Sequence, residues 1–260
     1  ATPVFVDSEK DTWNISPELL KQAIESRIAN GKKPKAIVAV HLYGMPYKIA
    51  EIKEISEYYD IPVVEDSAEA LGSSYNGVNC GSFGAIGILS FNGNKIITTS
   101  GGGALVSKNE DYKKRAVFLA THRMSNILAG IGRGQMEVLQ DRVNARRFVY
   151  QTYFDQLSHL KEIEFLQEPT GYYSNRWLTC ILTPSFETRE EIRNVLLEHN
   201  IESRPLWKPM HLQPVFEKYI NFSNGTSEDL FNRGLCLPSG SNLNIEDVNY
   251  IIALIKTVIS

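Results

Sequence analysis

The stretch KAIVAVHLYGMPYKIAEIKEISEYYDIPVVED, residues 35–66, decides the fold. Residues 35–42 form a continuous apolar run, and a second short run at 61–64 ends in Glu65 and Asp66. Between them, residues 49–59 carry apolar side chains at helical spacing. A strand, a helix and a strand in this order form a βαβ unit, whose two strands are parallel. The stretch therefore predicts a mostly parallel sheet covered by helices.

Further helices and strands are predicted on both sides of this unit. Ser16 and Pro17 have the residue types of a helix N-cap and first helical position, which predicts a helix over 17–29. The pattern changes near residue 160, which predicts a large domain at 1–157 and a smaller α+β domain at 158–260. The expected strands are 85–91, 104–106, 163–166, 177–182 and 201–206, and the expected helices are 125–157, 189–199 and 245–258.

Composition narrows the function classes. The chain has 260 residues, 43% of them apolar and 22% charged, with a formal charge of −3. These values predict a folded protein without the positive field that collects nucleic acid or anionic membrane. Three cysteines with no CxxC spacing favour a reducing compartment, so we expect a cytoplasmic protein. No HExxH, GxGxxG or P-loop pattern is present, which disfavours zinc, dinucleotide and nucleotide-triphosphate sites.

Two residues at predicted strand ends could carry chemistry. Asp66 ends the strand at 61–66, and ligands of open α/β sheets lie at the carboxyl ends of strands. The alternative is an aspartate that caps the following helix. Lys95 follows an Asn-Gly turn directly after an apolar run. Its alternative is a solvated lysine beside a turn.

Longer strings connect these two residues. VEDSAEALG at 64–72, GSFG at 81–84 and SFNGNKIITTSGGG at 90–103 closely resemble the pyridoxal-phosphate sugar-nucleotide aminotransferases of the DegT and StrS type. SNRWL at 174–178 and ESRPLWKPMH at 202–211 are most similar to the branch that aminates UDP-4-keto-6-deoxy-N-acetylglucosamine on the way to bacillosamine. The resemblance covers essentially the whole chain.

This resemblance implies a fold type I enzyme with pyridoxal 5'-phosphate as cofactor. It gives Asp66 the role of holding the ring nitrogen protonated, and Lys95 that of the Schiff-base lysine and proton carrier. It places the Ser90 hydroxyl at the cofactor phosphate and Glu69 beside the ring hydroxyl. Glu69 has an alternative role, since a glutamate in a first helical turn also suits the helix dipole.

A second group of residues suits the substrate. Arg204, Lys208 and His211 surround Trp207 within eight positions, which predicts a site for a nucleotide diphosphate with a stacking surface. The alternative is that Arg204 pairs with a local carboxylate and Lys208 is solvated. Asn175, Arg176 and Trp177 are further candidates for the mouth of the same site.

The expected reaction is transamination of a nucleotide-linked 4-keto-6-deoxy sugar with L-glutamate as donor. The resemblance implies a homodimer with shared active sites, and no nucleic acid or membrane partner. Two alternatives stay open. A sugar dehydratase of the same fold would carry histidine in place of Lys95, which counts against it. A cofactor-free binding or regulatory module is the other.

The chain also departs from the family pattern. Family members begin with a domain-sized N-terminal stretch, and they insert a loop ending Gly-Tyr-Asn-Tyr before the equivalent of residues 123–126. We therefore expect a partial record of a longer enzyme, with a missing loop near 121–123. Such a chain would leave an apolar sheet face exposed. We therefore expect one of two outcomes. Either a swapped or packed oligomer covers that face, or the N-terminal stretch and the loop near Thr121 were lost to proteolysis or disorder, which a break between Thr121 and Arg123 would support.

Overall fold

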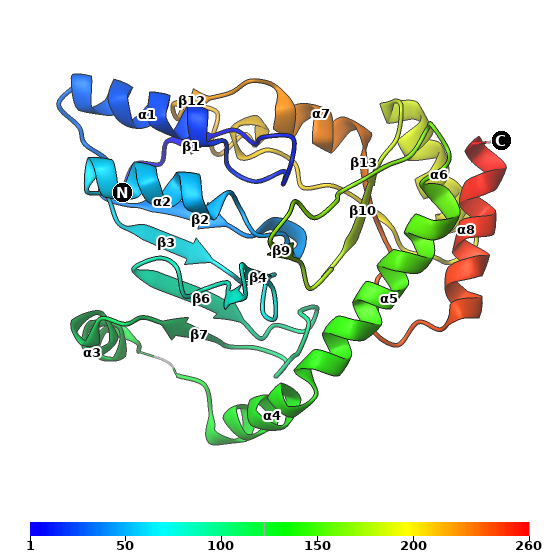
Figure 1. Ribbon diagram of the computed structural model, residues 1–260, viewed down its shortest axis with the longest axis horizontal. Coiled ribbons are helices and arrows are strands. Elements are labelled where there is room, and N and C mark those ends of the chain that lie inside the picture. Colours follow the sequence, from blue (N-terminus) through cyan, green and yellow to red (C-terminus); the bar gives the residue numbers. More distant parts are fainter. Residues whose placement is uncertain (122, 260) are drawn as a thin grey trace.

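The computed structural model describes residues 1–121 and 123–259, and its first sheet has the strand order β2-β3-β6-β7 (Figure 1). The predicted βαβ unit is confirmed, because β2 and β3 are parallel and α2 lies between them in the chain. β6 continues the parallel arrangement and β7 runs antiparallel to it. The bounds are β2 Ile37–Val40, α2 Ile49–Tyr59, β3 Val63–Asp66, β6 Ile86–Ser90 and β7 Gly103–Val106.

One face of this sheet is covered by α2 and by α1, Pro17–Ala29. Ser16 is the N-cap of α1 as predicted, since its hydroxyl accepts the Leu19 N–H at 3.2 Å. Residues of α1, α2, β2 and β3 share one apolar cluster, which includes Leu20, Ile24, Ile37, Ala39 and Ile52. Burial of this cluster fixes the helices on that face.

The opposite face of the sheet is open. Val38, Ile88 and Leu105 are 61%, 36% and 40% exposed. The expected apolar face is therefore present on this chain. α3 (Glu110–Leu119) and α4 (Asn126–Glu137) follow β7 in the chain and contain no buried residue. The predicted break between Thr121 and Arg123 spans His122, which lies outside the described residues.

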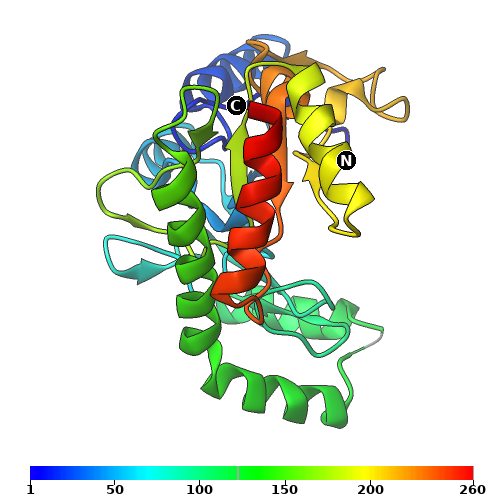
Figure 2. The same ribbon diagram turned by 90° about the vertical axis from the view of Figure 1, so that its right-hand side faces the viewer.

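A second sheet is built from the C-terminal half, in the order β11-β13-β10-β8 and antiparallel throughout. α5, α6 and α8 share its apolar core, and α5 and α8 lie side by side in Figure 2. The α+β character expected for this half is confirmed. The bounds are α5 Leu139–Leu157, β8 Glu164–Phe165, β10 Thr179–Leu182, α6 Phe186–Glu198, β11 Arg204–Pro205, α7 Thr226–Arg233, β13 Gly234–Leu237 and α8 Ile245–Ile259.

Short strands connect the two halves. β1 pairs with β12 in parallel, and β9 adds to the hairpin of β4 and β5. Both pairings cross the predicted domain boundary at 157/158, which stays a prediction. The predicted helix over 125–157 is wrong in one respect, because α4 and α5 are separate helices that meet at Val138. The bounds are β1 Phe5–Val6, β4 Ser74–Tyr75, β5 Val78–Asn79, β9 Tyr172–Tyr173 and β12 Asn221–Phe222.

Within residues 1–121 and 123–259, no helix combines the length and the apolar character that crossing a membrane requires.

Candidate active site

Two carboxylates lie where β3 ends. Asp66 is the last residue of β3, and its Oδ1 accepts the Ala68 N–H at 3.1 Å. Glu69 lies in the following turn, and its Oε2 accepts the Tyr43 N–H at 2.8 Å. Burial raises the pKa of Glu69, the Tyr43 N–H and the Lys95 ammonium oppose that shift, and the charge of Asp66 adds to it. The charges of Lys95 and Asp66 therefore both act on Glu69.

Lys95 comes from the turn that follows β6. Its N–H donates to Asn92 O at 3.1 Å, which closes the turn. Its Nζ lies 3.6 Å from Glu69 Oε1, and both side chains are 13% exposed. Because β3 and β6 are parallel neighbours, their carboxyl ends bring Asp66, Glu69 and Lys95 together at one edge. Ser90 ends β6 on the same connection, where its hydroxyl accepts the Asn92 N–H at 3.4 Å.

Two aromatic residues complete this cluster: Tyr43, which the sequence did not single out, and Trp177, which was expected at the mouth of the substrate site. The Trp177 ring lies under Lys95, with its centroid 4.2 Å from Nζ. Tyr43 has a left-handed backbone with φ 57°, and its hydroxyl accepts the Trp207 N–H at 2.9 Å. A positive φ at a tyrosine is strained and persists only where its surroundings hold it. Tyr43 thus links Glu69, through its N–H, to the stretch around Trp207.

Trp207 lies beside the cluster, but its charged neighbours in the sequence differ in their ion-pair partners. The Trp207 ring is 5.7 Å from that of Tyr43 and 6.4 Å from that of Trp177. Arg204 is exposed, and its Nη2 lies 2.6 Å from Glu202 Oε1. This is the pairing with a local carboxylate that the sequence leaves open as the alternative for Arg204. Lys208 is exposed, with no ion pair to any described residue. His211 Nε2 lies 2.9 Å from Glu228 Oε1.

Asn175 and Arg176 are both buried in this chain, and their place at the mouth of the substrate site stays a prediction. The Asn175 side chain is fully buried and donates to the carbonyls of Glu69 and Leu71, both at 2.9 Å. Arg176 stacks on Tyr150 at 3.6 Å from the ring centroid and is also buried. The Asn175 amide is therefore satisfied by the protein and joins the two halves. Arg176 Nη1 donates to Leu166 O at 2.6 Å, whereas its buried Nε has no hydrogen-bond partner among the described residues.

A buried hydrogen bond lies beneath the strand ends. His41 Nε2 lies 2.9 Å from Glu65 Oε2, and both side chains are fully buried. The Tyr47 N–H donates to His41 Nδ1 at 3.4 Å, which leaves Nε2 as the donor to Glu65. Burial alone would raise the pKa of Glu65, but hydrogen bonds from His41 and from the Gly84 and Gly81 N–H groups lower it. Glu65 thus ties β2 and the 81–84 turn to the strand that carries Asp66.

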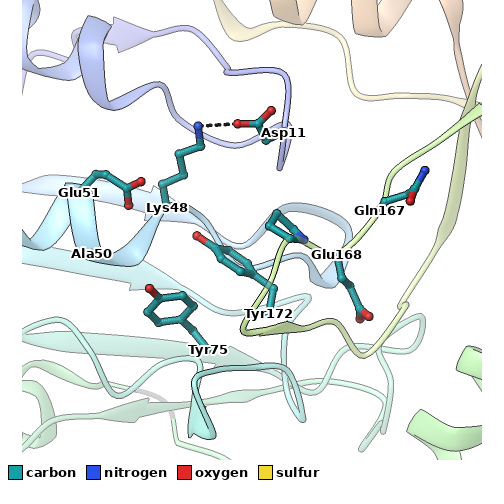
Figure 3. A pocket seen from close by; sticks show the side chains of 9 residues that line it. Asp11, Lys48, Ala50, Glu51, Tyr75, Gln167, Glu168 and Tyr172 are labelled. Carbon is teal, nitrogen blue, oxygen red and sulfur yellow. Dashed lines mark hydrogen bonds and ion pairs between the residues drawn. The ribbon is translucent and has the colours of Figure 1, made fainter.

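A pocket of about 500 Å³ lies away from these residues (Figure 3). Its cation, Lys48, is bound at 2.7 Å by Asp11 and at 3.2 Å by Glu9, and Tyr75 and Tyr172 form part of its wall. None of the predicted site residues lines it. We assign the site to the Lys95 cluster, because an amine and two carboxylates meet there at the carboxyl edge of the parallel strands.

Comparison with known proteins identifies the family. The model of the DegT/DnrJ/EryC1/StrS aminotransferase family matches residues 1–124 and 120–256. The chain belongs to this family. EpsN of Bacillus subtilis, described as a pyridoxal phosphate-dependent aminotransferase, is 46% identical over 276 positions, which include 98% of this chain and 71% of EpsN. The GDP-perosamine synthase of Escherichia coli O157:H7 is 38% identical over 96% of this chain and 71% of its own length.

Solved structures agree. A DegT DnrJ EryC1 StrS aminotransferase from Brucella abortus superposes with a TM-score of 0.91 at 28% identity, over 100% of this chain and 74% of that one. The pyridoxal-phosphate form of the sugar aminotransferase Spr1654 from Streptococcus pneumoniae gives 0.89 at 26% identity, over 99% and 75%. The protein is a sugar aminotransferase of fold type I, and its cofactor is pyridoxal 5'-phosphate. The expected family and fold are confirmed.

The residues of the cluster fit this cofactor. A primary amine suits its aldehyde, and a carboxylate at a strand end suits its ring nitrogen. Lys95 supplies the first and Asp66 the second. Glu69 adds a carboxylate within reach of the amine.

Proposed function

We propose that this family member transfers the amino group of L-glutamate to a nucleotide-linked 4-keto-6-deoxy sugar, for surface glycan or glycoprotein synthesis. The observation that carries the proposal is the group formed by Lys95, Glu69 and Asp66, with Nζ 3.6 Å from the Glu69 carboxylate. This group has the parts that transamination requires: an amine, a proton holder and a carboxylate for the ring nitrogen.

Each side chain has a distinct task. When bound, pyridoxal phosphate supplies an aldehyde and a protonated ring that draws electrons from the carbon being deprotonated. Asp66 keeps the proton on the ring nitrogen. Lys95 holds the aldehyde between turnovers, and its Nζ then moves the proton that the reaction relocates. Glu69 holds the Lys95 ammonium when the amine is free, and Ser90 donates to the phosphate.

The sugar is the finer part of the proposal. The strings at 174–178 and 202–211 favour a UDP-linked 4-keto-6-deoxy-N-acetylglucosamine, whereas relatives named GDP-perosamine synthase point to a guanine nucleotide. Trp207 lies next to the cluster and offers a ring for stacking, and Lys208 offers an unpaired ammonium for the diphosphate. Arg204 and His211 stay in the proposed set as weaker members, because each has a carboxylate partner.

The test compares Lys95→Ala with Lys53→Ala, an exposed lysine that pairs with Glu57 on α2. Glutamate and UDP- or GDP-linked keto sugars are supplied, bound cofactor is followed by visible absorbance, and amino sugar is measured by mass spectrometry. We expect Lys95→Ala to lose both the lysine-bound absorbance band and the product, and Lys53→Ala to retain both.

Amino-sugar formation by Lys95→Ala at the parental rate would overturn the assignment. A deoxygenated product without nitrogen would favour the dehydratase alternative. A parent protein that binds no cofactor would favour the binding module.

We further propose that the enzyme works as a homodimer with shared active sites. α3 and α4 support this, because they contain no buried residue and expose Phe118 at 80% and Ile127 at 76%. Apolar side chains exposed to this degree on neighbouring helices are typical of an interface. Sedimentation velocity should give twice the chain mass for the parent and a smaller species for Phe118→Glu. A parent that sediments as a monomer would contradict the proposal.

A missing loop near 121–123 stays part of the proposal. The family match is divided at residues 120–124, and the alignment with EpsN has more positions than this chain has residues. Both facts are in keeping with a segment that relatives have at this place. Inserting the corresponding EpsN segment at 121–123 should strengthen cofactor binding, which equilibrium titration would measure. No change on insertion would speak against a role for the loop.

A further inference from the structure

The turn that carries Lys95 has few contacts of its own. Residues 92–94 are exposed, and no atom lies within 4 Å of the place where a Gly93 Cβ would be. The Lys95 N–H bond to Asn92 O is local to the turn. A turn held only by such local bonds would let the Lys95 side chain take many positions.

Trp177 supplies a long-range contact. Its indole Nε1–H donates to Asn94 O at 2.8 Å, across 83 positions of sequence. The same ring lies 4.2 Å from Lys95 Nζ. One side chain therefore fixes the backbone next to the lysine and also faces its ammonium, an arrangement in which the hydrogen bond and the cation–π attraction act together.

Trp177 is itself held firmly. It is 3% exposed, its N–H donates to Asn175 Oδ1 at 2.9 Å, and its carbonyl accepts from the buried Arg146. The preceding Arg176 has φ 51°, a strained value that the surrounding contacts maintain. Since Trp177 lies two residues before the start of β10, these contacts attach it to the second sheet.

We propose that Trp177 is the positioning residue for Lys95, tying the 92–95 turn to the second sheet and keeping the amine between its ring and Glu69. The proposal rests on the proposed function of Lys95. Trp177 acts through the lysine and not on the sugar, so its loss lowers the rate of amine transfer without weakening substrate binding.

The test uses two variants of the full chain. Trp177→Phe keeps a ring but loses the N–H bond to Asn94 O, and Trp177→Leu loses both. With bound cofactor, kcat should fall about fivefold in Trp177→Phe and about thirtyfold in Trp177→Leu, since a hydrogen bond and a cation–π contact of ordinary strength are lost in turn. KM for glutamate and for the keto sugar should stay within about twofold. Trp207→Phe is the matched control for the next readout.

Hydrogen exchange in the cofactor-free protein gives a readout that does not depend on activity. The Lys95 amide should exchange faster in both Trp177 variants, whereas amides in α8 should be unchanged and Trp207→Phe should match the parent at the turn. Unchanged exchange at residues 92–95 in Trp177→Phe would overturn the tether. A raised KM at constant kcat would place Trp177 in substrate binding instead. A parent that binds no cofactor would refute the proposed function, while the exchange comparison would still decide the tether.

Discussion

The carboxylate of Asp7 should stabilise the fold in a pH-dependent way that a single substitution can reveal. Asp7 follows β1, and its two oxygens accept hydrogen bonds from the start of α7 and the loop before it: Oδ1 from the Ser227 N–H, and Oδ2 from the Ser223 hydroxyl and the Asn224 and Gly225 N–H groups. Burial alone would raise the pKa of Asp7, but hydrogen bonds from Ser227 and Ser223 outweigh it and lower the pKa from 3.8 to about 2.

The magnitude follows from this shift. A pKa that falls from 3.8 to about 2 corresponds to about 2 kcal/mol of stabilisation at neutral pH, because a tenfold change in proton affinity is worth about 1.4 kcal/mol. The folded-state pKa is depressed, so the stabilisation is present above pH 3.8 and is lost as the pH falls toward 2. About half of it should remain near pH 3.

Asp7→Asn removes the charge and keeps the shape. Urea unfolding should show the variant less stable than the parent by about 2 kcal/mol at pH 7, by the same amount at pH 5, and by about half as much near pH 3. Asp60→Asn is the matched control, since the Asp60 side chain is fully exposed and 4.0 Å from Lys33. It should change stability by less than about 0.5 kcal/mol. A difference for Asp7→Asn that does not vary with pH would refute the reasoning.

The remaining predictions concern the site and its support. Asp66→Asn should keep cofactor binding but lower the rate of transamination about a thousandfold, because an amide cannot hold the ring nitrogen protonated. Stopped-flow absorbance with glutamate measures this rate, and a mild effect would return Asp66 to a capping role. Lys208→Ala should raise KM for the nucleotide sugar and leave the glutamate half-reaction unchanged. Arg204→Ala should raise this KM less, because Arg204 already pairs with Glu202. Equal damage to both half-reactions would place Lys208 and Arg204 at the cofactor. Glu65→Gln should destabilise the protein by about 2 kcal/mol at pH 7, measured by urea unfolding, because an amide cannot accept all the hydrogen bonds that the carboxylate accepts from His41, Gly81 and Gly84. A change under about 0.5 kcal/mol would contradict that role.

Local patterns predicted the helices of the first half well. α1 and α2 have the bounds expected from the apolar spacing and the Ser16 cap, because both helices bury one face against the sheet. α3 was not predicted, since it buries no residue and so carries no periodic apolar signal. Its start is marked only by Asn109, whose side chain accepts the Asp111 and Tyr112 N–H groups.

The candidate site was predictable only in part. Asp66 and Lys95 stood out because a strand end and an Asn-Gly turn mark them in the sequence, whereas Ser90 and Glu69 came from the family resemblance. Tyr43 did not stand out, because its contacts with Glu69 and Trp207 join residues 26 and 164 positions apart. Trp177 was placed only at the substrate mouth, with Asn175 and Arg176, because its contact with Lys95 spans 82 positions. Spacing along the chain gives no measure of burial, and all three side chains are buried.

The site depends on both sheets at once. Asp66 ends a strand of the first sheet and Lys95 lies in the turn after β6, but the ring under the amine comes from Trp177, two residues before β10. Tyr43 accepts a hydrogen bond from Trp207, in the stretch after β11. Asn175 binds the carbonyls of Glu69 and Leu71, so the same turn that presents Trp177 also fixes the backbone of Glu69. A shift between the halves would therefore move the amine and its carboxylate partner together with the ring. For this reason, substitutions that loosen the joint at Asn175 should lower cofactor affinity without touching a residue that binds it.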